Sequence, residues 1–99
     1  MDVTTAIVAK LVAKPGQEED VAGFLAAALP LAEAEPATVA WFALRTDATT
    51  FWIVDAFPDA AGRQAHLEGQ IATALMANAE DLLAEPPDIR PADVLAVKG

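Results

Sequence analysis

The chain has 99 residues, of which 55% are hydrophobic and 21% are charged, so residues 1–99 have the size and apolar content of one folded domain. A disordered chain is excluded, because such chains lack the apolar residues that a core requires. The net charge of −9 argues against nucleic acid and against an anionic membrane surface as partners, since both select a basic face.

Several kinds of site are excluded by residue types that are missing. The sequence has no cysteine and no serine, which removes disulfides, thiolate metal sites and a serine or cysteine nucleophile. One histidine with scattered carboxylates does not predict a metal site, and no glycine-rich phosphate loop is present. No basic segment precedes an apolar run at the N-terminus, and no apolar run reaches about 18 residues. We therefore expect a cytoplasmic protein without a membrane span.

The first half of the chain predicts two strands and one interrupted helix. Residues 3–14 have the composition of a strand that is apolar on both faces, and Pro15 ends it. An amphipathic helix follows, with acidic residues 18–20 at its start, and Pro30 predicts a kink or break near its end. Residues 38–45 predict the second strand.

The second half predicts a hairpin, two helices and a last strand. A turn at residues 47–49 joins the second strand to a third strand at 51–57. A short helix follows and ends near Gly69. A longer helix is expected over residues 70–84, where a pair of prolines stops it, and residues 93–97 predict a fourth strand.

The order of these elements predicts the fold class. Strand, helix, strand, strand, helix, strand is the α+β, ferredoxin-like split βαβ arrangement, an antiparallel sheet with helices on one face. The helices can cover only one face, yet the strands are apolar on both. We therefore expect the same sheet of a second copy to cover the other face, giving a homodimer.

His66 is the most plausible acid–base residue of the sequence. It is the single histidine, and histidine is the side chain whose ordinary pKa is near neutrality. Gly62 and Gly69 flank it and leave space beside the ring. The alternative interpretation is a histidine on the helix surface or at a helix cap.

Asp55 interrupts an apolar strand face, where a carboxylate must be paired, exposed or functional. A salt bridge to Arg63 or Lys10 is the alternative to a catalytic role. A further set of side chains could wall or neutralise an aromatic ligand: Trp41, Trp52, Phe57 and Arg45. Core packing, a dimer contact or surface placement is the ordinary alternative for each of them.

Three short segments carry a family resemblance. Glu-Pro-Ala-Thr at 35–38 resembles a Glu-Pro-Gly-Cys/Thr turn, and Asp-Ala-Phe at 55–57 resembles an acidic-x-aromatic strand end. Ala-His-Leu at 65–67 matches an Ala/Ser-His-Leu helix segment. With the order of elements over nearly the whole chain, these segments are similar to the antibiotic biosynthesis monooxygenase family of dimeric α/β barrels, which includes quinol monooxygenases. Many members carry a second histidine five positions after the first, and in this sequence that position is Ile71.

The resemblance implies a cofactor-independent monooxygenase that oxidises a quinol, phenol or anthrone with O2, with no metal or cofactor. It implies His66 as general base, assisted by Asp55, beside an aromatic pocket. Two alternatives stay open. One is a cofactor-free isomerase, decarboxylase or lyase that acts on a similar ring compound. The other is a dimeric small-molecule binding or stress-response protein without catalysis.

Overall fold

The computed structural model describes residues 2–99 and contains four strands and four helical segments. The strands are β1 (Thr5–Val12), β2 (Ala40–Arg45), β3 (Thr50–Phe57) and β4 (Asp88–Asp93). The helices are α1 (Glu18–Ala27), α2 (Leu29–Glu33), α3 (Ala60–Leu67) and α4 (Gln70–Leu82).

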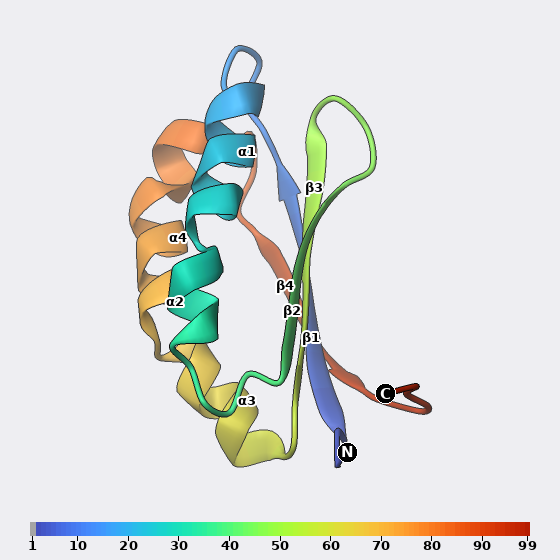
Figure 1. Ribbon diagram of the computed structural model, residues 1–99. Helices are drawn as coiled ribbons and strands as arrows, with labels where there is room; N and C mark the ends of the chain where they lie inside the picture. The colour runs from blue at the N-terminus through green and yellow to red at the C-terminus, as the bar shows by residue number, and fades with distance from the viewer. Residues whose placement is uncertain (1) are drawn as a thin grey trace.

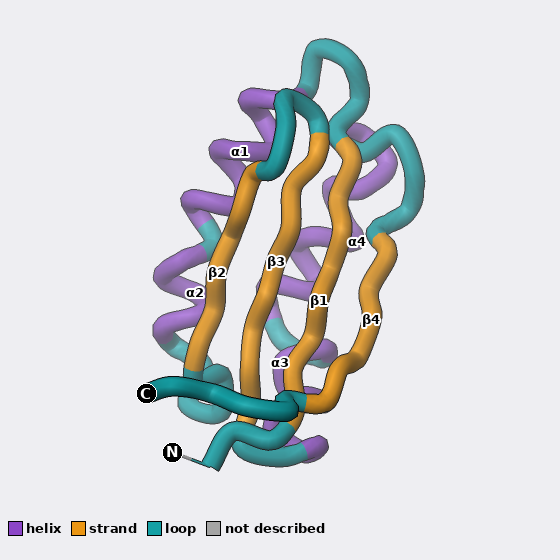
Figure 2. Tube along the Cα trace, turned by 90° about the vertical axis from the view of Figure 1, so that its right-hand side faces the viewer, coloured by secondary structure: helices purple, strands orange, loops and turns teal. Residues whose placement is uncertain are grey.

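The four strands form one antiparallel sheet in the order β2-β3-β1-β4. All the helices lie against one face of this sheet (Figure 1), and the opposite face is turned toward the viewer in Figure 2. The two layers and this strand order confirm the predicted α+β, ferredoxin-like fold.

The core lies between the sheet and the helices. Along β1 and β3, buried residues alternate with half-buried ones, as the two-residue period of a strand requires. The largest fully buried apolar side chains come from these two strands and from α1 and α4: Leu11, Phe51, Phe57, Val21 and Ile71. Asp55 and Phe57 of β3 therefore lie directly against the helical layer.

The predicted break near Pro30 is confirmed. α1 ends at Ala27, and α2 begins at Leu29 with Pro30 in its first turn, where the missing N–H removes no helical hydrogen bond. The long helix ends at Leu82 rather than at residue 84. Among residues 2–99, no helix has both the length and the apolar character needed to cross a membrane.

The position of the fourth strand differs from the prediction. Residues 93–97 were the apolar run, but the strand is Asp88–Asp93 and the chain beyond it joins no strand. The cause is tertiary: the N–H of Ala84 donates to the carbonyl of Val12 at 2.8 Å, which brings the chain alongside β1 directly after α4. Pro91 is tolerated in the ladder because β4 is an edge strand.

The face of the sheet that no helix covers is called the open face here. Its side chains come from alternate positions of neighbouring strands, and most of them are apolar: Val8, Phe42, Leu44, Trp52 and Val54. Phe42 is 57% exposed and Leu44 is 47% exposed. The sequence-based expectation that the strands are apolar on both faces therefore agrees with the structure.

Candidate active site

His66 lies on the inner side of α3. The helix begins at Asp59, whose Oδ1 accepts a hydrogen bond from the N–H of Gly62 at 2.9 Å, so the cap is satisfied locally. One turn further on, the imidazole of His66 points into the molecule and is only 7% exposed, with its ring 5.3 Å from that of Phe57. The alternative of a surface or capping histidine is therefore excluded.

Two carboxylates flank the imidazole, one at each ring nitrogen. Nδ1 is 2.6 Å from Oε1 of Glu35, and Nε2 is 2.9 Å from Oδ2 of Asp55. Glu35 follows α2 and Asp55 belongs to β3, so the fold brings together three residues from distant parts of the chain. The result is a buried carboxylate–imidazole–carboxylate row.

Asp55 is 1% exposed, and its partner is His66. The expected salt bridge to Arg63 or Lys10 is wrong, because Arg63 donates to the carbonyl of Ala92 and Lys10 lies on the open face, 5.9 Å from the ring of Trp52. The approach of Nε2 to Asp55 is an ion-pair contact without the alignment of a good hydrogen bond. Within residues 2–99, neither carboxylate oxygen of Asp55 has a well-aligned hydrogen-bond partner.

The surroundings of His66 act on its pKa in opposite directions. Burial alone would lower the pKa, because it disfavours the charged ring. The contacts to Asp55 and Glu35 outweigh burial and raise the pKa from 6.5 to about 8. The ring is therefore mostly an imidazolium at pH 7, and both of its nitrogens carry protons.

A small cavity of about 30 Å³ adjoins this row. Its polar lining comes from Asp55 and His66, and aliphatic side chains from the sheet and α4 form the rest. Leu67 and Ile89 lie at its border and are each 39% exposed, so they form the side nearest to solvent. The space holds about one water molecule. A carboxylate oxygen that lacks a well-aligned hydrogen bond beside such a space can accept a proton or a hydrogen bond from a bound molecule.

A solved structure of high sequence identity identifies the family of the chain. NE2512 of Nitrosomonas europaea, a protein of unknown function, is 58% identical; the match covers 98% of this chain and 94% of that one, with a TM-score of 0.96. The chain belongs to the family of NE2512.

More distant structural matches show which fold this family has. A Nitrosomonas europaea protein provisionally assigned as an antibiotic biosynthesis monooxygenase has a TM-score of 0.85 at 18% identity, over 100% of this chain and 97% of that one. A second structure, described as an antibiotic biosynthesis monooxygenase, has a TM-score of 0.80 at 17% identity, over 93% and 99%. The NE2512 family thus has the antibiotic biosynthesis monooxygenase fold. No protein-family model and no curated protein matches the sequence.

In this chain, which is a relative of NE2512, the two tryptophans lie on opposite faces of the sheet. Trp41 faces the helices, opposite Asp55 in the strand ladder, and packs against Ala28 and Ile71. Its buried Nε1 has no hydrogen-bond partner within residues 2–99. Trp52 lies on the open face and donates from Nε1 to Oγ1 of Thr46 at 3.0 Å. Phe57 and Trp41 therefore share the layer of His66, and Trp52 does not.

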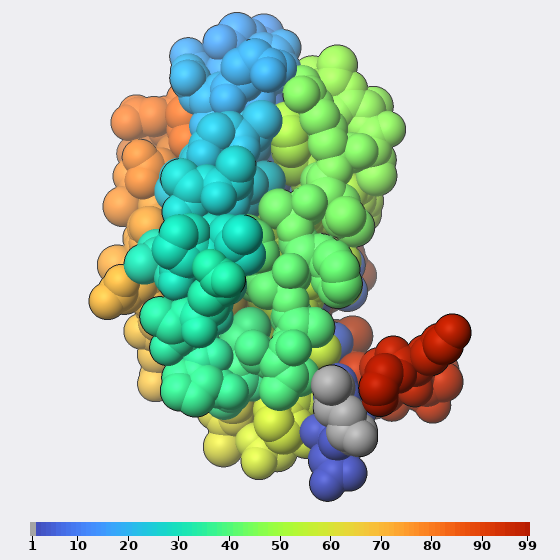
Figure 3. Space-filling view, in the orientation of Figure 1, coloured from blue at the N-terminus to red at the C-terminus, as the bar shows by residue number. Residues whose placement is uncertain are grey.

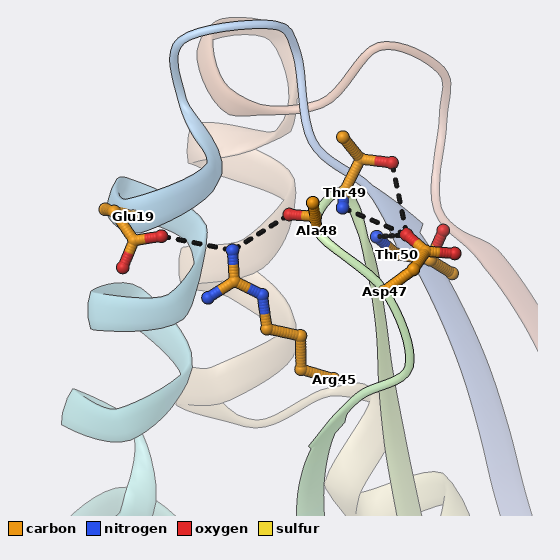
Figure 4. A network of polar contacts seen from close by, with 6 residues as sticks. All are labelled: Glu19, Arg45, Asp47, Ala48, Thr49 and Thr50. Carbon is orange, nitrogen blue, oxygen red and sulfur yellow. Dashed lines mark hydrogen bonds and ion pairs between the residues drawn. The ribbon is translucent and has the colours of Figure 1, made fainter.

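Arg45 lies at the hairpin end of the sheet, whereas α3 lies at the opposite end (Figure 1). Its Nη2 donates to Oε2 of Glu19 at 3.0 Å and to the carbonyl of Ala48 at 2.9 Å (Figure 4). Next to it, Asp47 closes the turn by accepting from the N–H groups of Thr49 and Thr50, which confirms the predicted hairpin. The structure thus gives Arg45 a structural partner and does not bring it to His66.

Glu35 is the member of the row that residue-type reasoning missed. The only signal for it was its place at the start of the Glu-Pro-Ala-Thr segment, which by itself marks a turn. Its contact with His66 spans 31 positions of the chain and depends on how the segment after α2 lies against α3. Among residues 2–99, no three histidine, aspartate or glutamate side chains are arranged so that they could hold a metal ion.

A larger surface hollow, of about 480 Å³, lies elsewhere. It is lined by the C-terminal part of α4, the prolines after it and Lys14. No residue of the carboxylate–imidazole–carboxylate row lines it, so we assign it no part in the chemistry of His66.

Proposed function

We propose that the protein is a cofactor-independent monooxygenase that oxidises a small aromatic substrate, such as a quinol, phenol or anthrone, with O2. The observation that carries the proposal is the buried Asp55–His66 pair, whose carboxylate lacks a well-aligned hydrogen bond and borders a mainly apolar cavity. The fold shared with the antibiotic biosynthesis monooxygenases adds support. The carboxylate offers a proton acceptor that is shielded from bulk solvent.

Asp55 and His66 take separate roles in this proposal. The sequence analysis expects His66 as the base. The scheme proposed here assigns the base to Asp55 instead, because the two carboxylates favour the imidazolium form of His66, which has no lone pair to receive a proton. Asp55 therefore accepts the substrate proton, and the positive charge of His66 stabilises the oxyanion that develops next to it. Both are catalytic residues under this scheme, and His66 becomes a base only above its pKa of about 8.

The chemical steps balance without a further redox partner. For an anthrone-type substrate, loss of a ring CH proton to Asp55 leaves a carbanion, which forms a carbon–oxygen bond with O2. The resulting peroxide anion takes up a proton, and the hydroperoxide then loses water as the ring carbon becomes a carbonyl. One oxygen atom enters the product and the other leaves as water. Leu67 and Ile89 must move aside for a ring to enter, since the cavity is small.

Oxygen uptake with a panel of quinols and anthrones tests the proposal. We expect Asp55→Asn to lower kcat/KM at least about 100-fold, the usual contribution of a general base. Asp81→Asn is the matched control, because Asp81 is exposed on α4, and it should leave the rate unchanged. Equal rates for wild type and Asp55→Asn would contradict the role of Asp55. Turnover that persists without O2 would instead identify an isomerase, decarboxylase or lyase.

We also propose that a second copy of the chain covers the open face. Apolar side chains dominate that face, and a monomer would leave them in water. The C-terminal residues also project on the open-face side, apart from the body of the molecule, as Figure 3 shows in red. Leu95 in this segment is 94% exposed, which suits a contact with a partner. The occupant we infer is an identical sheet, because two-fold pairing matches an apolar face with itself.

A further inference from the structure

Glu35 is held in one position by its own turn. Its N–H donates to the carbonyl of Ala32 at 3.1 Å, and the N–H of Thr38 donates to the carbonyl of Glu35 at 3.2 Å. The hydroxyl of Thr38 also donates to Oε1 at 2.7 Å, the oxygen that contacts Nδ1 of His66. The carboxylate is thus aimed at the imidazole before any substrate binds.

The other oxygen of Glu35 occupies space that Gly69 provides. A Cβ on Gly69 would lie 2.8 Å from Oε2 of Glu35 and 3.2 Å from the carbonyl oxygen of His66. The first distance is too short for a real contact, so the Glu35 carboxylate would have to shift. The second is also a tight contact, so an added Cβ could not relieve the first by moving toward the His66 carbonyl. A glycine at the junction of α3 and α4 is therefore what allows the carboxylate to approach the ring.

The charges that face His66 come from two elements. Asp55 faces it from β3 and Glu35 from the segment after α2, whereas the neighbouring β1, α4 and β4 present aliphatic side chains, among them Ile7, Ile71 and Ile89. One imidazolium thus stands between two carboxylates. Asp55 is fully buried, but the side chain of Glu35 is 20% exposed, so Glu35 is the member nearest to solvent.

We propose that Glu35 is a positioning residue for the reactive pair: by accepting from Nδ1–H, it favours the imidazolium form of His66 and holds the ring with Nε2 beside Asp55. The inference rests on the proposed function in so far as it assigns a reactive pair. Glu35 itself does not line the cavity. Its action passes through His66, as second partners of catalytic histidines commonly act.

The loss of Glu35 has two consequences for the ring. A counter-charge within hydrogen-bond distance is removed, so the proton of His66 is released at lower pH. The neutral ring can then place its remaining proton on either nitrogen, and the form protonated at Nδ1 turns a lone pair toward the carboxylate of Asp55. If catalysis needs the imidazolium, the variant without Glu35 therefore loses activity at a lower pH than the wild type does as the pH rises.

Heteronuclear NMR titration of the His66 ring tests this inference without substrate. Because His66 is the single histidine, its ring signals identify it directly. We expect Glu35→Gln to lower the pKa of His66 by about one to two units. Glu33→Gln, at an exposed position two residues earlier, is the control that should leave the pKa within about 0.3 units of wild type. An unchanged pKa in folded Glu35→Gln overturns the proposal.

Two further variants keep the test decisive if Glu35→Gln does not fold. Gly69→Ala should lower the pKa of His66 by displacing an intact Glu35, whereas Glu35→Asp should recover part of the wild-type pKa. Unchanged values in both variants overturn the inference. If the protein consumes O2, the alkaline limb of its kcat/KM profile should move to lower pH together with the pKa. A shifted pKa in a protein that oxidises none of the substrates refutes the proposed function and leaves the positioning role standing.

Discussion

At the scale of single residues, the raised pKa of His66 links folding to pH. The folded-state pKa of about 8 exceeds the ordinary value of 6.5, so the stabilising contribution is complete below pH 6.5 and is lost as the pH rises through 8. The loss amounts to roughly 1–2 kcal/mol, since one pKa unit corresponds to about 1.4 kcal/mol. Urea unfolding of wild type and His66→Gln between about pH 6 and pH 9 measures it. Parallel stability profiles of the two proteins would contradict the linkage.

The residue types of the site could be predicted, but their contacts could not. His66 was identifiable as the single histidine and Asp55 as a charge on an apolar strand face. The attraction between opposite charges predicts a lysine or arginine partner for Asp55, whereas the structure places the ring of His66 beside it. Glu35 gave no chemical signal of its own, since its role exists only once the segment after α2 lies against α3.

At the scale of elements, the cap of α3 determines how firmly His66 is presented. Asp59→Ala removes the acceptor for the N–H of Gly62 and should lower the free energy of unfolding by about 1 kcal/mol. Asp59→Ser keeps a capping oxygen and should retain most of that stability. Urea unfolding at pH 7 distinguishes them. Equal losses in both variants would show that the side chain acts through something other than the cap.

Local sequence patterns predict the strands and helices, except for β4, whose position is determined by its pairing with β1. Alternating and helical periods gave β1, β3 and the helices close to their observed bounds. The fourth strand was misplaced because its segment contains Pro91 and charged residues, which locally favour a loop. Its ladder with β1 outweighed that preference, and the more apolar segment around Leu95 was left outside the sheet.

At the scale of the whole molecule, the open face predicts self-association. Sedimentation velocity at micromolar concentration should show a wild-type dimer. Phe42→Asp places a charge on that face and should weaken the dimer at least about 100-fold, because an unpaired charge buried between two sheets costs several kcal/mol. Leu29→Asp is the matched control: Leu29 is 48% exposed on α2, on the helical side of the sheet, so its substitution should leave the dimer intact. A wild-type monomer, or equal weakening by both substitutions, would exclude the open face as the interface.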